Sequence, residues 1–506
     1  MTAKVLHLHH DDNVVVALDP IDQGQYLPQY DVHTLNPIES GHKIALGDMK
    51  AGDHVVKLGV VIGIAKADIQ KGEHVHRHNL KMPEVAITHV GGGQRERDLP
   101  HNQFKGRTFK GYRREDGRVG TRNFIGILPV VNCSATVTRM IADHFRHLDQ
   151  DKYPNVDGVF ALTHQHGCSV AAFPEGYDLM QRTLAGYVRH PNFGGMVVIG
   201  LGCEDNPVGA LMKEHDLSET ATRKIFEIQS EGGTKSTVQA GIEAVEKLLE
   251  GINQDEREEV SISELTLALQ CGGSDGFSAI GANPALGVAS DLLAAAGGSS
   301  ILSETPEIFG VHHLLKARAV NSSVALEVDQ LIDWWLDHAK RWDGSLDDNP
   351  SEGNAEGGLT TIIEKALGSA SKGGHGPLMD VRRYGQPLRE KGLTFMDSPG
   401  NDWVSVTGQV ATGANIVAFT TGRGSVFGCR PAPSVKLATN SRLYSRMEDD
   451  MDINCGPVVE GEISLVEKGC EILEMLIETA SGKLTKSEEL GFGQEEMSPW
   501  VISGTV

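Results

Sequence analysis

Four cysteines stand out because each follows a short apolar run and has glycine and polar residues around it. Cys133, Cys168 and Cys203 are spaced 35 residues apart, and Cys271 follows 68 residues later. A strand, a helix and two loops use roughly 30 or more residues, so the spacing itself is unremarkable. The position of each cysteine, at most a few residues after an apolar run, is what predicts one cysteine at each of several strand ends. Ligands bind beyond the carboxyl ends of parallel strands, so the four thiols can approach one another if these strands are neighbours. Because thiolates bind iron and zinc, the pattern indicates a shared metal site.

The segment THQHGC makes the strongest local case for such a site. His164, His166 and Cys168 alternate in it, so an extended chain would project all three from one face. Histidine is both a common metal ligand and the usual proton carrier at neutral pH. Core packing remains the alternative for each cysteine, because free cysteine is among the most buried residue types.

A second stretch is suited to holding an acid. FTTGRGSVFG, residues 419–428, follows an apolar run and places three glycines around Arg423. Its backbone N–H groups and the planar guanidinium together predict a carboxylate-binding loop; a glycine-rich turn with a surface arginine is the alternative. GLGCED begins like a dinucleotide fingerprint but lacks the third glycine, so we exclude a nicotinamide cofactor.

Three regions with different sequence patterns must position these residues. Residues 1–80 contain short Val- and Ile-rich runs punctuated by Gly and Asp, which predicts a small β domain. Residues 81–108 mix Gly, Pro and charge without periodicity and are typical of a linker. Strands alternate with amphipathic helices in residues 109–389, and the same texture returns in residues 390–506. We therefore expect two α/β domains with mainly parallel sheets after the β domain.

Composition bounds the function further. The 506 residues exceed what one hydrophobic core usually serves, and the net charge of -22 argues against a nucleic-acid-binding surface. The chain lacks a basic, apolar leader and any run of ~18 apolar residues, so we expect no membrane contact and a cytoplasmic location. Seven cysteines are too few for a disulfide scaffold in so long a chain.

Longer motifs resemble a known family. FKGYRREDGRVGTRN, YPNVDGV, VIGLGCE, CGGSDGFSA with ANPALG, and FTTGRG are similar to segments of the altronate and galactarate dehydratases. The segment from GHKIALGDM to KGEHVHRHN is similar to the amino-terminal SAF domain of that family, which is of β-clip type. The resemblance covers nearly the whole chain, and the family carries cysteines that match all four named above.

The resemblance implies a hydro-lyase that removes water from a six-carbon sugar acid and gives a 2-keto-3-deoxy acid. It also implies iron(II) as activator, with manganese as an alternative; three or four converging cysteines would also permit an iron–sulfur cluster. The C2 proton of such an acid is weakly acidic, so its removal needs a base and positive charge near the carboxylate.

We assign candidate roles on this basis. His164 and His166 are the candidates for base and acid, in either order, and Arg423 is expected to bind the substrate carboxylate. Asp275 is expected to hydrogen-bond a substrate hydroxyl or to orient a histidine. The expected metal ligands are Cys133, Cys168, Cys203, Cys271 and His76.

His76 belongs to GEHVHRHN, in which His74, His76 and His78 alternate. An exposed histidine strip is the simpler reading of this pattern. The SAF resemblance suggests instead that this face covers the active site and contributes His76 or contacts to the distal carbons of the sugar.

D-Altronate is the favoured substrate. Neutral histidines hydrogen-bond hydroxyl groups well but hold the second carboxylate of galactarate less firmly. Galactarate, another hydroxy acid such as a sulfonated one, and a non-catalytic sugar-acid-binding protein remain alternatives. We expect a homo-oligomer, namely a dimer, whose partner molecule is a small sugar acid.

Overall fold

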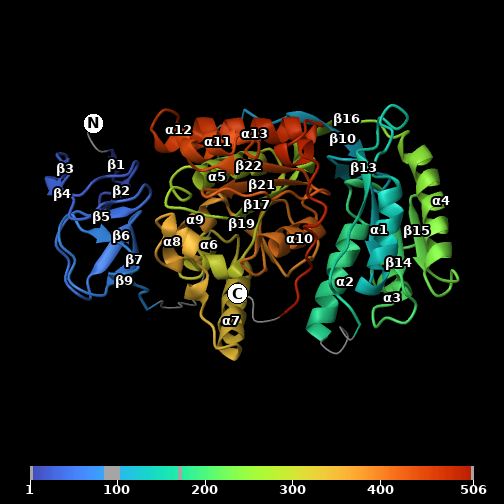
Figure 1. The fold of residues 1–506 in the computed structure, drawn as a ribbon, viewed down its shortest axis with the longest axis horizontal. Helices are drawn as coiled ribbons and strands as arrows, with labels where there is room; N and C mark the ends of the chain where they lie inside the picture. Colours follow the sequence, from blue (N-terminus) through green and yellow to red (C-terminus); the bar gives the residue numbers. More distant parts are fainter. Residues whose placement is uncertain (1–3, 85–102, 169–173, 503–506) are drawn as a thin grey trace.

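Three regions lie side by side along the molecule, and their spatial order differs from their order in the chain (Figure 1). The computed structural model describes residues 4–84, 103–168 and 174–502. The N-terminal domain lies at one end, the C-terminal part of the chain forms the centre, and the second domain lies at the other end. Within these ranges, no helix is long and apolar enough to cross a membrane.

Short antiparallel strands build the N-terminal domain. Its sheets have the orders β1-β2-β5-β8, β6-β7-β9 and β3-β4. The strands are β1 (Val5–Leu6), β2 (Val14–Ala17), β3 (Tyr26–Leu27), β4 (Val32–His33), β5 (Lys43–Ala45), β6 (His54–Lys57), β7 (Val60–Ala65), β8 (His74–Val75) and β9 (Leu80–Lys81). Neighbouring positions of one strand point to opposite sides, so Val14 and Val15 enter two different apolar clusters.

The second domain is a parallel sheet of order β13-β12-β14-β15 between two layers of helices. Its elements are β12 (Phe124–Pro129), η1 (Asn132–Ser134), α1 (Ala135–His144), β13 (Gly158–Ala161), α2 (Pro174–Val188), β14 (Phe193–Gly200), α3 (Val208–Glu214), β15 (Arg223–Glu227) and α4 (Thr234–Ile252). Ile125 and Ile127 pack toward α1 and α4, whereas Leu128 packs toward α2 and α3. Both faces of the sheet are therefore buried, as parallel sheets require.

The central domain contains a seven-stranded parallel sheet of order β19-β20-β18-β17-β21-β22-β23. The strands are β17 (Thr266–Cys271), β18 (Ser299–Leu302), β19 (Leu378–Arg382), β20 (Gly392–Met396), β21 (Ile416–Thr421), β22 (Ser434–Ala438) and β23 (Ile453–Asn454). Leu267 and Leu269 face the cluster that includes α5 and α13, and Ala268 faces the cluster shared with the second domain.

Helices and a small sheet complete the central domain. The helices are η3 (Ile262–Glu264), α5 (Ala282–Ala295), η4 (Thr305–Ile308), α6 (His312–Lys316), α7 (Ser322–Arg341), η5 (Leu346–Asp348), α8 (Glu352–Glu356), α9 (Ile362–Ser371), α10 (Asp402–Thr412), α11 (Ser441–Arg446), α12 (Gly456–Val459), α13 (Leu465–Ala480) and α14 (Lys486–Glu489). An antiparallel sheet of β11 (Val119–Gly120), β10 (Thr108–Arg113) and β16 (Glu258–Ser261) lies near the junction with the second domain (Figure 1).

The fold class is as expected: a small N-terminal β domain precedes two α/β domains with mainly parallel sheets. The expected boundary between residues 389 and 390, however, falls inside one sheet. Ser299 of β18 pairs with Gly392 of β20, and Leu267 of β17 pairs with Ile416 of β21. The boundary between the two parallel sheets lies at residues 253–265 instead. The strands β12 to β15 before it form the four-stranded sheet, and the strands β17 to β23 after it form the seven-stranded sheet. Parallel neighbours are joined by long crossovers, so distance along the chain does not reveal which sheet a strand joins.

Candidate active site at the carboxyl edges of two parallel sheets

A cluster of buried charges lies at the carboxyl edge of the seven-stranded sheet. Cys271 ends β17, Glu304 follows β18, and Asp402 begins α10 after β20. Glu307 in η4 and Lys365 and Lys372 from the α9 segment complete the charged cluster, and we keep this name for these six residues. Their position at strand ends is where ligands bind in open parallel sheets.

Cys271 and Lys372 are in direct contact within this charged cluster. Lys372 Nζ lies 2.9 Å from the sulfur of Cys271, and the lysine side chain has no exposed surface. Burial raises the pKa of the Cys271 thiol, while the ammonium of Lys372 opposes this rise. Burial alone would lower the pKa of Lys372, but Cys271, Glu304 and Glu307 raise it above its ordinary value. The lysine is therefore a fixed positive charge.

Glu304 and Glu307 lie in contrasting environments. Glu307 accepts from Ser369 Oγ at 2.8 Å and pairs with Lys365 Nζ at 2.7 Å. Burial would raise the pKa of Glu307, but Lys365 and Lys372 lower it. Among the residues that the structure describes, none hydrogen-bonds to the carboxylate oxygens of Glu304, although Lys372 Nζ lies 3.8 Å from one of them. Burial and then Glu307 raise the pKa of Glu304 well above the ordinary range. These opposite shifts favour an ionised Glu307 beside a neutral Glu304, and carboxyl groups whose pKa values are pushed apart are typical of acid–base sites.

The backbone at Glu304 is held in an unfavourable conformation. Its φ of 72° is left-handed, although the residue is not glycine. Its N–H donates to Ser398 Oγ at 3.0 Å, and the N–H of Thr305 donates to the carbonyl of Ser398 at 3.0 Å. Strained backbone of this kind persists only where the surroundings fix it, and it is common at active sites.

A polar pocket of about 270 Å³ opens onto the charged cluster. Cys271, Glu307, Lys365 and Asp402 line it. The other lining residues are Gly272, Gly273, Ser274, Asn349, Ser351, Asn354, Gly400, Asn401 and Trp403. A Cβ atom on Gly272 would lie 2.2 Å from Asp402 Oδ2, so only glycine lets this carboxylate approach the loop. Burial and then the charge of Glu307 raise the pKa of Asp402 to about 6.

Asp275 and Arg423 line a neighbouring hollow of about 500 Å³. The carboxylate of Asp275 is buried and accepts from Ser278 Oγ, Thr439 Oγ1 and Asn440 Nδ2 at 2.9 to 3.1 Å. These contacts tie the loop that follows β17 to the loop that follows β22. The guanidinium of Arg423 is 45% exposed and pairs with Glu356 at 2.7 Å.

Cys133, Cys168 and Cys203 lie at the carboxyl edge of the other parallel sheet. They follow β12, β13 and β14, which are neighbours, and all three are exposed. Burial and then the nearby thiols of Cys133 and Cys203 raise the pKa of Cys168, so the three sulfurs lie within electrostatic reach of one another. We call them the three-thiol group. Gln229 Nε2 donates to the sulfur of Cys203 at 3.3 Å.

The expectation that four cysteines converge therefore needs correction. Cys271 ends a strand of the seven-stranded sheet, whereas the three-thiol group belongs to the four-stranded sheet. The near-regular spacing concealed this difference, because the chain leaves one sheet and starts another between Cys203 and Cys271.

His164 and His166 support the loop that carries Cys168. His164 is 3% exposed; its Nε2–H donates to the carbonyl of Pro129 at 2.8 Å, and its Nδ1 accepts from the His166 N–H at 3.2 Å. Burial lowers the pKa of His164 to about 4, and burial also lowers the pKa of His166. The rings of His164 and His166 lie together, with centroids 5.6 Å apart, but both are buried whereas Cys168 is exposed.

The ring of His76 contacts a backbone carbonyl of the central domain. Its Nε2–H donates to the carbonyl of Ala355 at 3.0 Å, and burial lowers its pKa to about 4. Among the residues that the structure describes, two groups bring three possible metal-ligand atoms within 4.8 Å of one another. One group is Cys271, Glu304 and Glu307, and the other is His9, His10 and Asp11. His76 belongs to neither of these groups.

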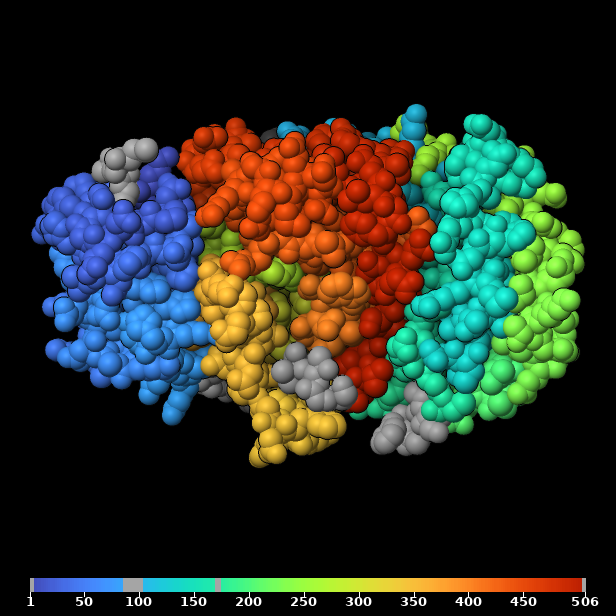
Figure 2. Space-filling model, in the orientation of Figure 1, coloured from blue at the N-terminus to red at the C-terminus, as the bar shows by residue number. Residues whose placement is uncertain are grey.

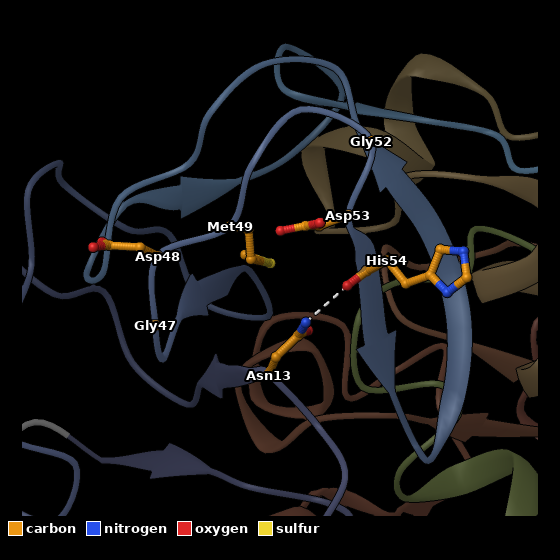
Figure 3. A pocket seen from close by; sticks show the side chains of 7 residues that line it. All are labelled: Asn13, Gly47, Asp48, Met49, Gly52, Asp53 and His54. Carbon is orange, nitrogen blue, oxygen red and sulfur yellow. Dashed lines mark hydrogen bonds between the residues drawn. The ribbon is translucent and has the colours of Figure 1, made fainter.

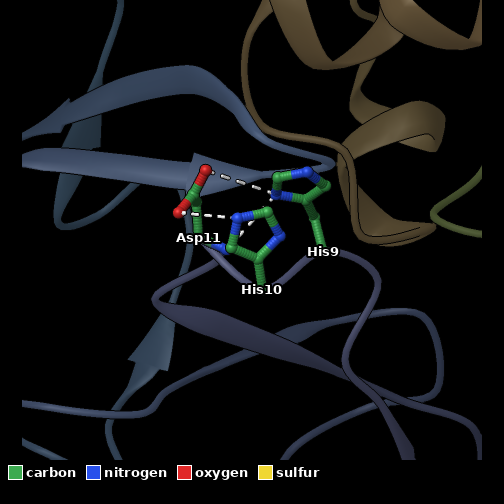
Figure 4. Close-up of side chains that lie close together, drawn as sticks. All are labelled: His9, His10 and Asp11. Carbon is green, nitrogen blue, oxygen red and sulfur yellow. Dashed lines mark hydrogen bonds and ion pairs between the residues drawn. The ribbon is translucent and has the colours of Figure 1, made fainter.

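Two features of the N-terminal domain are poor candidates for an active site. His9, His10 and Asp11 are consecutive, and Asp11 pairs with the His9 and His10 rings at 3.6 and 3.4 Å in a group that is largely exposed (Figure 4). A hollow lined by Asn13, Asp48, Asp53 and His54 is wide but open, and Asn13 Nδ2 donates to the carbonyl of His54 at 2.8 Å (Figure 3). Neither contains a buried charged group of the kind that the charged cluster holds.

Five members of the charged cluster were missed by sequence reasoning: Glu304, Glu307, Lys365, Lys372 and Asp402. The rule that selected the cysteines would also have selected SETPEIF, because its two glutamates follow the apolar run of β18. The lysines are seven residues apart, which is two helical turns, so they share a side of α9 and the residues after it. No signal in the sequence reveals that these segments meet.

Three family models match the three regions of the chain. The altronate/galactarate dehydratase SAF domain matches residues 3–83, the D-galactarate dehydratase/altronate hydrolase second domain matches residues 111–253, and the D-galactarate/altronate dehydratase C-terminal domain matches residues 262–505. The last two ranges agree with the separation of the two parallel sheets.

Individual relatives extend over nearly the whole chain. An altronate dehydratase of Bacillus subtilis (strain 168) is 39% identical and covers 96% of this chain and 97% of its own length. A galactarate dehydratase (L-threo-forming) of Escherichia coli (strain K12) is 36% identical and covers 95% of this chain and 94% of its own. The (2R)-sulfolactate sulfo-lyase subunit beta of Chromohalobacter salexigens is 36% identical over 77% of this chain and 96% of its own length. The chain thus belongs to the altronate/galactarate dehydratase family.

Proposed function

We propose that the protein is a hydro-lyase that dehydrates a six-carbon aldonic acid, preferably D-altronate, to a 2-keto-3-deoxy acid. Family membership supports sugar-acid dehydration, since the relatives at 36 to 39% identity include altronate and galactarate dehydratases. The observation that carries the proposal is the pocket on the charged cluster, where ionised and neutral carboxyl groups and two lysines meet at strand ends.

The pocket residues suit removal of the C2 proton. Lys365 Nζ is a cation at the pocket wall, and it would bind the substrate carboxylate and stabilise the charge that develops there as the C2–H bond breaks. Asp402 is the proposed base, because a pKa of about 6 leaves it ionised at neutral pH and close to the ideal strength. Glu304, whose pKa burial raises well above its ordinary value, is the proposed proton source for the C3 hydroxyl as it leaves. Glu304 does not itself line the pocket, so the proton would pass by way of Glu307, which lines the pocket and lies within 4.8 Å of Glu304.

Iron(II) is the proposed metal, with manganese as the alternative. The residues of the three-thiol group supply ligands of the type that iron prefers, exposed thiols at neighbouring strand ends, but their three sulfurs do not all lie within 4.8 Å of one another, so binding would draw them together. When bound, iron supplies positive charge that can polarise a substrate oxygen. Cys271 fits less well, since the Lys372 ammonium lies 2.9 Å from its sulfur and would repel a cation.

The charges of the pocket favour altronate over galactarate. Lys365 accompanies two carboxylates, Glu307 and Asp402, in the pocket lining. A second carboxylate on the substrate would meet these negative charges, whereas the terminal CH2OH of altronate would not. We further propose a cytoplasmic homodimer that binds the small acid and neither nucleic acid nor membrane.

A substrate panel tests the proposal. Purified protein is loaded with iron(II) under anaerobic conditions and incubated with altronate, galactarate and (2R)-sulfolactate, and 2-keto-3-deoxy acids are assayed. We expect kcat/KM for altronate to exceed that for galactarate by about tenfold or more, a ratio that corresponds to about 1.4 kcal/mol of repulsion between the second carboxylate and the pocket. A preference for galactarate would reveal a second anion-binding group, and binding without turnover of any acid would identify a sugar-acid-binding protein.

A further inference from the structure

We infer that the N-terminal domain positions one wall of the candidate active site by holding residues 350–358 through their backbone carbonyls, with Arg77, His76 and His42 as the positioning residues. The inference rests on the proposed function only in taking the 270 Å³ pocket as the catalytic one. In Figure 2 the N-terminal domain is seated against the segment that contains these residues.

The N-terminal domain contacts this segment mainly at backbone oxygens. Arg77 Nη2 donates to the carbonyl of Pro350 at 2.7 Å, and His76 Nε2 donates to that of Ala355 at 3.0 Å. The other contacts to carbonyls are His42 Nε2 to Glu356 at 3.1 Å, Lys43 Nζ to Gly358 at 2.6 Å and Arg77 Nε to Thr360 at 3.4 Å. Because the acceptors are main-chain atoms, these bonds fix the path of the segment.

The opposite side of the same segment forms the active-site wall. Ser351 and Asn354 line the pocket on the charged cluster. Asn354 Nδ2 donates to the carbonyl of Ser274 at 2.9 Å, and the N–H of Gly276 donates to the carbonyl of Gly357 at 2.7 Å. The segment thus joins the N-terminal domain to the loop that follows Cys271.

Glycines allow the two backbones to meet. A Cβ atom on Gly276 would lie 2.2 Å from the carbonyl oxygen of Gly41, and one on Gly358 would lie 2.3 Å from the same atom. Real Cβ atoms do not approach so closely, so these positions accept only glycine without a shift of the backbone. The close approach brings the N-terminal domain directly against the loop that follows Cys271.

A buried ion group fixes the docking of the N-terminal domain. Glu364 of α9 pairs with Lys43 Nζ at 2.9 Å and with Lys57 Nζ at 2.7 Å, and all three side chains are at most 1% exposed. Burial would raise the pKa of Glu364, but the two lysines lower it far below its ordinary value. Breaking such a group leaves an unpaired buried charge, so the domain is held in one orientation.

The histidines act on the wall rather than on the substrate. His76 and His42 each use Nε2 on a carbonyl, and His42 Nδ1 lies 2.9 Å from Nε2 of His74. Their contribution to turnover is therefore geometric, since a displacement of about 1 Å in an active site can lower the rate 10²-fold.

Arg77→Ala in the full-length chain tests the inference. We expect amide hydrogen exchange in residues 349–360 to become at least about tenfold faster, because the bonds that fix this segment are lost. With the substrate identified by the panel, kcat should fall about 10- to 100-fold, and KM should also rise. A purely structural role would lower the fraction of folded enzyme and leave KM unchanged.

Matched variants sharpen the test. Arg77→Lys keeps the charge and one donor, so it should recover part of the lost activity. Glu352→Gln removes the exposed ion pair with Arg77 but keeps its bonds to carbonyls, and Lys50→Ala removes an exposed charge elsewhere in the same domain. Both should behave as wild type, since exposed ion pairs contribute little.

Each result bears on the inference separately from the proposed function. Unchanged exchange in residues 349–360 of Arg77→Ala would overturn it, and so would faster exchange with unaltered kinetics. If the panel finds no substrate, the exchange measurement still decides whether Arg77 holds the wall, and affinity for altronate by calorimetry replaces kinetics. Equal loss in Arg77→Ala and Lys50→Ala would show a general effect on folding and would also overturn it.

Discussion

The two parallel sheets place reactive groups at the same edge but in opposite environments. At the four-stranded sheet, Cys133, Cys168 and Cys203 are exposed, and a neutral amide, Gln229, contacts one of the sulfurs. At the seven-stranded sheet, Cys271 is buried with an ammonium 2.9 Å away and carboxyl groups around it.

The difference shows why a thiol cannot be assigned a role from its strand position alone. Exposed thiols without a fixed counter-charge can exchange protons for a metal ion. A buried thiol beside a buried lysine already has its counter-charge, and the low local dielectric strengthens that pairing. We therefore propose metal binding for the three-thiol group and a catalytic role for the charged cluster.

Lys372→Met should produce the largest effect and would test the charged cluster. The substitution leaves Glu304, Glu307 and Cys271 without their fully buried cation, so the free energy of unfolding should fall by about 3–5 kcal/mol and activity should be lost. Lys247→Met, at an exposed position of α4, should change stability by less than ~0.5 kcal/mol. Denaturant titration measures both; equal stability of the two variants would contradict our view of the cluster.

Replacing single cysteines by serine should separate the two edges. We expect Cys133→Ser, Cys168→Ser and Cys203→Ser each to lower bound iron by roughly half or more, with little change in stability because these side chains are exposed. Cys271→Ser should keep its iron and lose activity. Iron analysis after anaerobic loading, with circular dichroism as the control for folding, gives the answer. The opposite pattern, iron lost only in Cys271→Ser, would reverse our assignment.

The pH dependence of the free energy of unfolding should differ between the two regions. We expect this effect to be smaller than those of the substitutions above. Burial lowers the pKa of His190 in the second domain to about 4, so its contribution to stability is lost as pH falls from 6.5 toward 4. The pKa of Asp402 is raised to about 6, so its contribution is present at low pH and is lost as pH rises through 6.

Variants make this difference measurable. Between pH 7 and pH 5, His190→Gln should lose less stability than wild type, and Asp402→Asn should lose more, each by roughly 1–3 kcal/mol. Denaturant midpoints at the two pH values test this. Parallel curves for all three proteins would mean that neither group titrates as its surroundings indicate.

Local pattern was enough to predict much of the architecture. Short apolar runs defined strands such as Thr266–Cys271, whose odd and even positions face two different clusters. The position of each cysteine after an apolar run correctly placed it at or beyond a strand end, because strand ends depend on nearby residues.

By itself, then, the sequence determined the fold class, the strand-end positions of the cysteines and the family motifs. Only the tertiary structure decided that Cys133, Cys168 and Cys203 are neighbours and that Cys271 is not. It also decided that Lys372 lies beside Cys271, 101 residues away, and that Arg77 holds Pro350. Strand order depends on the way in which the long crossover connections pack, and buried ion pairs depend on which charged groups lose their water. Neither can be seen from residues that are adjacent in the chain.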